Sequence, residues 1–396
     1  MFDLAEWLNL AIRWLHLTAG IAWIGSSFYF VWLDNHLTPP ARGDASGEVW
    51  SVHGGGFYHN QKYQVAPAQM PERLHWFKWE AYWTWISGFS LLVLVYYVGA
   101  RSFLIDPSKA ALSPAQGIGI GLSSLALGWL VYDLLCRSRV GRSNRLLGVI
   151  WFACLLAAAI VLDRLFNARG AYLHVGAIIG SAMVGNVFFV IIPNQRKVVA
   201  DLIAGRTPDP SLGAAAKQRS LHNNYMTLPV LFIMVSHHYP MTYGATRPWL
   251  VLALLGLTGV AVRHVFNLRH RGKETGPAIV LAAALAFISV SYVTLEKSGA
   301  RRAEQAAAAR NVTYAQVQPI FAKHCVACHS ARPTSPGIST PPLGVLLDSY
   351  AHARTVAPRI KAVAVDSQVM PLGNPTGMTP EERRILGAWI AAGTPQ

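Results

Sequence analysis

The chain is poor in charged residues, and those that it has are mostly basic. Only 13% of its 396 residues are Asp, Glu, Lys or Arg, whereas a soluble domain carries about 25%. Together with 53% hydrophobic residues and a mean hydropathy of +0.31, this deficit predicts an integral membrane protein in contact with lipid. The 34 Lys and Arg residues fall between apolar segments and not on one soluble face. We therefore expect no nucleic-acid partner.

Cysteine is also scarce, and four residues give no sign of a disulfide framework. Cys136 and Cys154 lie in apolar segments and are expected to be packing residues. The N-terminus lacks the basic start of a cleavable signal peptide, because Asp3 and Glu6 precede the first apolar run. The chain also lacks a Gly-rich fingerprint for a flavin or nicotinamide at the start of a βαβ unit.

Long apolar runs are abundant, and about 20 such residues suffice to span a membrane. Eight segments qualify, the sixth being short and containing Pro229: 8–33, 80–100, 115–136, 146–166, 172–193, 224–240, 247–266 and 276–296. The loops on one side carry 17 Lys and Arg residues, and those on the other side carry five. The positive-inside rule then puts both termini outside. We predict an all-α fold: a polytopic bundle of about eight spans in a bacterial inner membrane, with periplasmic termini.

The most specific motif is Cys325-Val326-Ala327-Cys328-His329. This is the C-x-x-C-H sequence that attaches a c-type haem, with Cys325 and Cys328 forming thioethers and His329 ligating the iron. A zinc site would need four ligands, and the tail offers only two further histidines, His324 and His352. Haem c is attached on the periplasmic side in bacteria, which agrees with the orientation given by the loop charges.

A methionine is the usual second iron ligand in cytochromes c. Met370 is followed directly by Pro371, the usual setting of that ligand, so we predict Met370 as the partner of His329 at the metal. Met378 precedes Thr379, which caps a helix, and is expected to pack. The chain thus divides into a membrane domain at 1–296, a helical or flexible tether at 297–312 and a small class I-like cytochrome c domain at 313–396.

Two spans begin with a histidine that is followed by small residues and an aromatic pair, at His16 and His174. This echo suggests a 4+4 repeat of helices. An ionisable residue in a span is a functional candidate, so the pair could ligate a haem b or could line a pocket for a planar anion. The 34–79 loop, which contains His53 and three glycines, is long enough to be functional or disordered.

Other polar residues stand near the starts of spans. His75 precedes the second span, and His222, Asn223 and Asn224 lie at the sixth. Amide groups suit the edge of a purine, which makes these four residues the catalytic candidates. The asparagines could equally cap a helix.

Several stretches together resemble one family, the membrane-bound, cytochrome-c-coupled bacterial urate oxidases with their urate oxidase N-terminal domain. The resemblance covers nearly the whole chain. The matching residues are Trp14-Leu15-His16 with Trp23-Ile24-Gly25, His75-Trp76-Phe77-Lys78-Trp79-Glu80-Ala81, Asn186-Val187-Phe188-Phe189 with Ile192-Pro193, His222-Asn223-Asn224-Tyr225 with Leu228-Pro229-Val230, and Met370-Pro371-Leu372-Gly373-Asn374 with Thr376-Gly377-Met378-Thr379.

The resemblance implies oxidation of urate to 5-hydroxyisourate, with electrons passing through haem c to a respiratory acceptor such as a soluble cytochrome c or a terminal oxidase. Urate gives up two electrons and a haem accepts one, so a second centre such as haem b, or two successive transfers, is required. Two other functions stay open. The chain could be a non-catalytic membrane-anchored cytochrome that relays electrons from a quinol pool or a partner dehydrogenase, or a transporter with a regulatory cytochrome.

Overall fold

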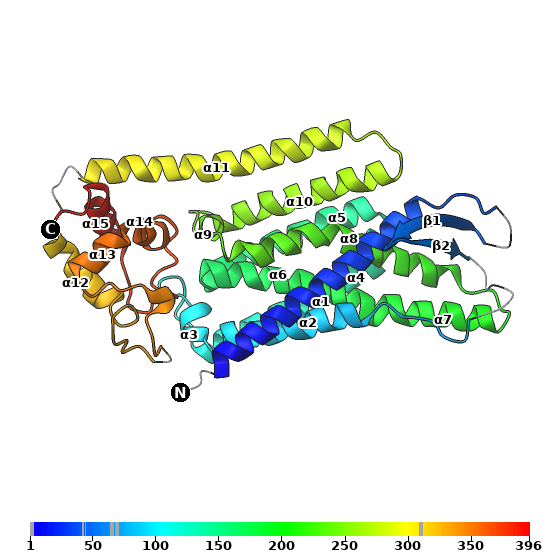
Figure 1. Cartoon of the computed structure of the whole chain (residues 1–396), viewed down its shortest axis with the longest axis horizontal. Helices are drawn as coiled ribbons and strands as arrows, with labels where there is room; N and C mark the ends of the chain where they lie inside the picture. Colours follow the sequence, from blue (N-terminus) through cyan, green and yellow to red (C-terminus); the bar gives the residue numbers. More distant parts are fainter. Residues whose placement is uncertain are drawn as a thin grey trace.

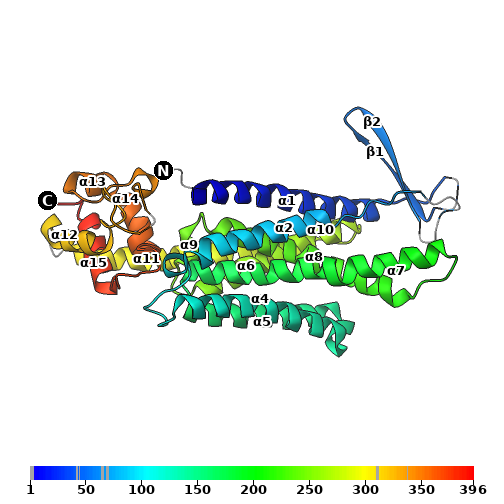
Figure 2. The ribbon, with the colours of Figure 1, turned by 90° about the horizontal axis from the view of Figure 1, so that it is seen from below.

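The computed structural model describes residues 4–41, 43, 45–63, 67, 71–308, 312–336 and 338–396. It is mostly helical, with 70% helix and 5% strand. An elongated helical bundle carries a smaller C-terminal domain at one end and a β-hairpin near the other (Figure 1). The N-terminal helix begins at the end of the bundle that carries the C-terminal domain, as both views show (Figure 2).

Each of the eight predicted spans overlaps a helix of the bundle. The helices are α1 (Leu4–Asn35), α2 (Trp79–Leu91), α3 (Ala100–Phe103), α4 (Pro114–Arg137), α5 (Asn144–Leu165), α6 (Ala168–Gly185), α7 (Ile192–Ile203), α8 (Pro210–Ser236), α9 (Pro240–Tyr243), α10 (Pro248–His270) and α11 (Gly276–Ala308).

Five helical stretches in the described residues are long and apolar enough to cross a membrane. They are Pro114–Arg137, Asn144–Leu165, Ala168–Ile203, Pro248–His270 and Gly276–Glu296. The chain is therefore a membrane protein by helix length and composition, but the predicted count of eight spans is not confirmed. Helices α1 and α8 carry several polar residues, and α2 has only 13 residues.

Helix α6 forms the centre of the bundle. Most of its residues are buried, and α4, α5 and α8 pack around it. Helix α1 lies at the periphery, where only Ala19 and Gly20 are buried and most apolar side chains face outward. The helices that carry His16 and His174 are thus in different environments, which is not the equivalence that a 4+4 repeat predicts.

Two long helices widen into π-helical turns, at Leu92–Tyr97 after α2 and at Asn186–Ile191 after α6. A π turn accommodates an extra residue and re-aims the side chains around it, and such turns are frequent at functional sites. The first turn places Tyr97 beside His174. The second places Asn186 beside Asn223 of α8 in the interior of the bundle.

The loop between α1 and α2 departs from the all-α prediction. It contains an antiparallel hairpin of β1 (Gly47–His53) and β2 (Gly56–Lys62). Gly54 and Gly55 form its two-residue turn with φ of +59° and +80°. Positive φ at both central residues is what a type I′ turn requires, and glycine adopts it without a steric penalty. The Gly-Gly pair between residues of high strand propensity was the signal for this hairpin.

In the described residues of the C-terminal domain, four α-helices surround a separate core. They are α12 (Tyr314–His324), α13 (Tyr350–Thr355), α14 (Ala357–Ile360) and α15 (Pro380–Ala391). Phe321 of α12 and Trp389 of α15 meet edge to face at 5.9 Å between ring centroids. The predicted tether at 297–312 is helical as far as Ala308, as part of α11, and residues 309–311 lie outside the described part.

Candidate functional site

A buried polar network occupies one face of α8. The Arg219 guanidinium is only 4% exposed and donates to Asp133 Oδ1 at 2.7 Å and to Asn186 Oδ1 at 3.0 Å. Asp133 also accepts from Arg137 at 2.7 Å. A buried charge needs a partner of opposite sign and further hydrogen bonds, and Arg219 has both.

His222 and Asn223 extend this network. The Asn186 amide donates to Tyr132 Oη at 3.1 Å and to Asn223 Oδ1 at 2.8 Å. Tyr132 therefore donates its own proton to His222 Nδ1, 2.8 Å away, and His222 Nε2 donates to Asn144 Oδ1 at 3.3 Å. The network joins α4, α5, α8 and the π turn after α6, and each of these side chains has a partner.

Asn224 points to a different cluster, although it adjoins Asn223 in the sequence. Its Oδ1 accepts from Arg263 Nε at 3.0 Å and from Asn267 Nδ2 at 2.9 Å, both on α10. The Phe28 ring of α1 stacks on the Arg263 guanidinium with 4.0 Å between the Cζ atom and the ring centroid. The two neighbouring asparagines thus serve two separate polar clusters.

His16 and His174 each bind their own neighbours. His16 Nδ1 donates to the Thr84 carbonyl of α2 at 2.9 Å and lies 3.1 Å from Ser87 Oγ. His174 is fully buried, donates from Nδ1 to the Gly170 carbonyl at 2.8 Å and accepts at Nε2 from Tyr97 Oη at 3.2 Å. A Cβ on Gly121 would lie 2.6 Å from His174 Nε2. The space beside this nitrogen is therefore filled.

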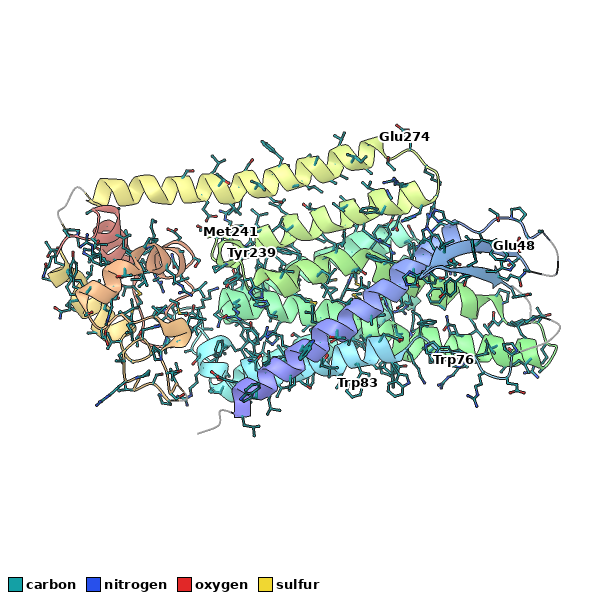
Figure 3. The ribbon with its side chains drawn as sticks, viewed as in Figure 1. Glu48, Trp76, Trp83, Tyr239, Met241 and Glu274 are labelled. Atoms are coloured by element: carbon teal, nitrogen blue, oxygen red, sulfur yellow. The ribbon has the colours of Figure 1, made fainter. Side chains whose placement is uncertain are left out.

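His75 lies apart from both polar clusters. It is exposed, and its ring packs edge to face on Phe77 with 4.5 Å between the ring centroids. Its neighbour Trp76 lies under the Arg196 guanidinium at 5.9 Å, and Figure 3 places Trp76 at the end of the bundle opposite the C-terminal domain. Of the four catalytic candidates, His222 and Asn223 share a network, and Asn224 and His75 do not belong to it.

The Cys-x-x-Cys-His segment forms a tight turn directly after α12. The backbone amides of Cys328 and His329 both donate to the Cys325 carbonyl, at 3.1 and 2.9 Å. His329 Nδ1 donates to the Val345 carbonyl at 3.1 Å, which fixes the tautomer and leaves Nε2 free. This is the arrangement usual for a histidine that ligates a metal through Nε2.

The two predicted methionines are held differently. Met370 is partly buried at the edge of the C-terminal core, and its carbonyl accepts from the buried Arg383 at 2.7 Å. Met378 is 3% exposed within that core, where its backbone is held by Asn374. Its low exposure is consistent with the predicted packing role, although Met378 also lines a cavity between the C-terminal domain and the bundle.

The two histidines that a zinc site could have used are engaged elsewhere. His324 lies 2.6 Å from Thr376 Oγ1 and 3.1 Å from Glu382 Oε1, and His352 pairs with Asp348 at 2.7 Å. Among the described residues, no three His, Cys, Asp or Glu side chains come together as a metal site.

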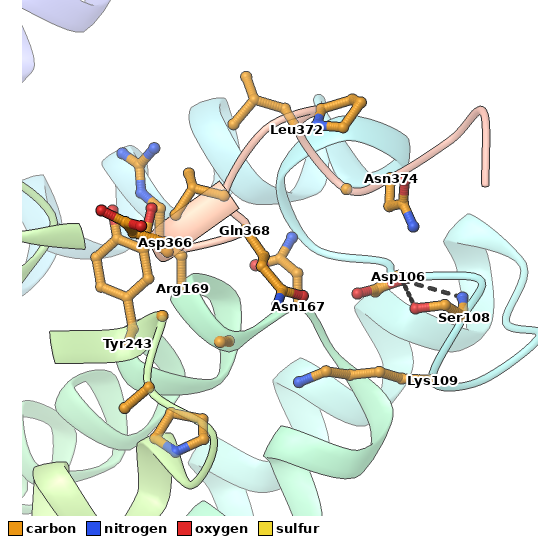
Figure 4. A pocket seen from close by; sticks show the side chains of 18 of the residues that line it. Asp106, Ser108, Lys109, Asn167, Arg169, Tyr243, Asp366, Gln368, Leu372 and Asn374 are labelled. Atoms are coloured by element: carbon orange, nitrogen blue, oxygen red, sulfur yellow. Dashed lines mark hydrogen bonds between the residues drawn. The ribbon is translucent and has the colours of Figure 1, made fainter. Parts of the chain in front are cut away.

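A cavity of about 960 Å³ lies between the C-terminal domain and the bundle, beside the place where the two are in contact (Figure 4). Arg169 lines it from α6, and Gln368 and Asn374 line it from the segments on either side of Met370. Lys109 and Asp163, which also line it, form an ion pair at 2.7 Å. Charged residues of both signs line this cavity.

The fold and these clusters define a helical membrane protein with a buried, amide- and arginine-rich interior. Residues 3–294 match a family model described as urate oxidase N-terminal. The chain belongs to this family, which indicates a urate-related function and an oxidoreductase that acts on urate. No curated protein and no solved structure matches the chain.

Several residues of these clusters were not among the predicted site residues. Three of them lie in apolar runs, namely Tyr132, Asp133 and Asn186. The other two, Arg219 and Arg263, were among the 17 loop Lys and Arg residues that were used only to orient the chain in the membrane. A polar residue within a span was the available signal. Which of them meet depends on how the helices pack, and sequence spacing does not reveal that.

Proposed function

We propose that the chain is a membrane-bound urate oxidase that passes electrons to a haem c covalently held by its own C-terminal domain. The match of residues 3–294 to the urate oxidase N-terminal family carries this proposal. The C-terminal Cys-x-x-Cys-His segment lies outside that match and supplies the electron acceptor.

The residues of the C-terminal domain fit a haem c. Cys325 and Cys328 flank one tight turn and are both free thiols. His329 is oriented by Val345 with Nε2 available, and Met370 borders the same apolar core. Cys325 and Cys328 would hold the porphyrin, and His329 and Met370 would hold the iron. The group would supply a one-electron acceptor.

The overall reaction balances with water as the oxygen donor. Urate and water give 5-hydroxyisourate, two protons and two electrons. Because the acceptor takes one electron at a time, each turnover needs two transfers to haem c and two onward transfers to a respiratory acceptor. Such an acceptor would be a soluble cytochrome c or a terminal oxidase.

A membrane haem b on His16 and His174 would need a rearrangement. Tyr97 occupies His174 Nε2, and α4 approaches closely at Gly121. His16 keeps Nε2 free of protein partners among the described residues. In the conformation described, His174 does not fit such a haem, and we derive no step through it.

The proposal is tested by adding urate to the purified holoprotein without oxygen. We expect the visible bands of reduced haem c to develop with urate, to the extent that dithionite produces them. Cys325→Ser combined with Cys328→Ser should abolish covalent haem in a denaturing gel, whereas Cys154→Ser in the membrane domain should retain it.

Two results would contradict the proposal. If dithionite reduces the haem and urate does not, the chain is not a urate oxidase. If the haem is reduced by a quinol or a partner dehydrogenase instead, the chain is the non-catalytic electron carrier that the sequence left open. Pyridine haemochrome spectra would count haem c and haem b in the same sample.

A further inference from the structure

Arg263 is a buried cation without a counter-ion. It is 4% exposed, as Arg219 is. Arg219 is neutralised by Asp133 at 2.7 Å, whereas no carboxylate of the described residues lies within ion-pair distance of Arg263. A charge removed from water without a partner costs several kcal/mol. Nη1 and Nη2 of Arg263 are not among the fully buried atoms that lack a hydrogen bond, so they keep accessible surface at which an anion from outside the described residues can neutralise the charge.

A second group beside Arg263 also lacks a partner. Asn224 Oδ1 accepts two hydrogen bonds, from Arg263 and Asn267, but Asn224 Nδ2 is buried and makes none. A buried amide donor without an acceptor is rare in native structures. Asn224 itself is only 3% exposed, so bulk water does not satisfy this donor.

The guanidinium is held in one plane. The Phe28 ring covers one of its faces at 4.0 Å, and Asn224 holds Nε in that plane. The described residues give Nη1 and Nη2 no hydrogen bond. The outer edge of a guanidinium is a two-donor fork that suits two acceptor atoms lying in its plane. A flat anion with acceptors on one edge matches this fork and the free amide of Asn224.

We propose that Arg263 and Asn224 bind the substrate of this chain, as a planar organic monoanion, with Phe28 orienting the guanidinium. This proposal rests on the function proposed above, in which that monoanion is urate. Urate is flat, negatively charged at neutral pH and bordered by carbonyl oxygens. A phosphate of a lipid head group is the other anion that could reach this end of the bundle, and the experiment separates the two.

The location suits entry from the side opposite the C-terminal domain. Arg263 lies 15 residues beyond the start of α10, or about 22 Å along its axis from the end nearest that domain. Phe28 belongs to α1, which lies at the periphery of the bundle.

Equilibrium binding of radiolabelled urate to the holoprotein in nanodiscs of neutral lipid tests the proposal. Arg263→Gln should weaken binding by at least about tenfold, because it removes charge-assisted hydrogen bonds. Arg269→Gln, which removes the same charge from an exposed position on the same helix, is the matched control and should leave binding unchanged. Hypoxanthine is flat but uncharged at neutral pH, so it does not depend on the charge of Arg263. It should bind the original chain, Arg263→Gln and Arg269→Gln equally weakly.

A second variant guards against a loss of folding in the first. Asn224→Asp keeps the side-chain shape and places a carboxylate where the amide now meets Arg263. It should keep or raise the thermal midpoint and still lose urate binding, because Arg263 is then neutralised within the protein.

The outcomes separate this proposal from the function on which it rests. If urate binds and reduces the haem equally well in the original chain, in Arg263→Gln and in Asn224→Asp, urate does not bind at Arg263 and the proposed function stands. If urate neither binds nor reduces the haem in the original chain, the function fails first. If anionic lipid in the nanodiscs displaces urate from the original chain and binding of that lipid is lost in Arg263→Gln, the site belongs to a lipid and the proposal is overturned.

Discussion

At the scale of single residues, the interior of the bundle is organised by two arginines of equal burial. Arg219 shares Asp133 with the exposed Arg137, so a carboxylate is held between two guanidinium groups. Arg263 has only amides and a phenyl ring. The Arg219–Asp133 pair can stabilise the contact of α4 with α8 without a ligand. Under the proposal above, the charge of Arg263 is neutralised only when an anion is bound.

Removal of the Asp133 charge should destabilise the bundle strongly. Asp133→Asn leaves Arg219 buried and unpaired, which costs about 3–5 kcal/mol. Arg137→Gln removes the exposed partner of the same carboxylate and should cost less than about 1 kcal/mol. Thermal unfolding in detergent measures both variants. Equal losses of stability would show that Arg219 does not depend on Asp133.

The two methionines of the C-terminal domain should respond differently to the same substitution. Met370→Leu removes the proposed sulfur ligand and should lower the reduction potential of haem c and abolish the far-red absorption of a Met-ligated haem. Met378→Leu is nearly isosteric in the core and should cost less than about 1.5 kcal/mol of stability with the potential unchanged. Redox titration with spectra distinguishes the two, and an unchanged potential in Met370→Leu would rule that ligand out.

At the scale of elements, helix caps and π turns differ in how far the sequence reveals them. The sequence predicted Thr379 as a helix cap from residue type alone, and in the structure Thr379 and Glu382 form a capping box at the start of α15. The π turn at Asn186–Ile191 carries no comparable signal. Its extra residue is accommodated by contacts with other helices, such as the bond of Asn186 to Asn223.

Removal of the cap should loosen the start of α15. Thr379→Ala takes away the oxygen that accepts from the Glu382 amide and should cost about 1 kcal/mol. Hydrogen exchange of the peptide that covers α15, measured by mass spectrometry, should accelerate about fivefold at neutral pH. Thr355→Ala, at the exposed end of α13, serves as the control and should leave that peptide unchanged.

The same cap should be sensitive to acid. The Thr379 amide, assisted by His324 and Lys323, lowers the pKa of Glu382 from 4.5 to about 2. Because the folded pKa lies below the unfolded one, this carboxylate contributes stability above pH 4.5 that is lost as the pH falls toward 2. Exchange of the α15 peptide should therefore rise relative to other helices below pH 4.5. In Glu382→Gln this extra rise should be absent.

At the scale of the whole molecule, the C-terminal domain is fitted against the bundle through close backbone contacts. A Cβ on Gly373 would lie within 3 Å of the carbonyl oxygens of Arg101, Ser102 and Ile105. Val369 also packs against the core of the bundle. The segment around Met370 thereby joins the C-terminal domain to the bundle. Under the proposed function, an electron that leaves the bundle for haem c would pass through this contact.

Widening this contact should slow electron transfer without loss of haem. Gly373→Ala presses a methyl group against three carbonyl oxygens, while Gly377→Ala has the same positive φ, +65° against +66°, with open space around it. Both variants carry the backbone cost of about 1–2 kcal/mol. Only Gly373→Ala should slow reduction of haem c by urate, at unchanged haem content. Equal rates in stopped-flow measurements would show that the contact is not on the electron path.

The sequence by itself determined that the chain is a helical membrane protein, that a helix lies in each of eight apolar stretches, and that a Cys-x-x-Cys-His segment follows the bundle. The bounds differ for some of them, since α8 begins at Pro210 and not at residue 224, and α11 continues to Ala308. The length of an apolar run, a cap residue and a short motif are all local in sequence, so residue order suffices for these features. Only the tertiary structure decided that Asn223 and Asn224 face different clusters, that Tyr97 closes His174, and that Arg263 is buried without a carboxylate. These features depend on how helices far apart in the chain are rotated and packed. The packing decides which side chains meet, and so which buried groups have a hydrogen-bond partner or an opposite charge.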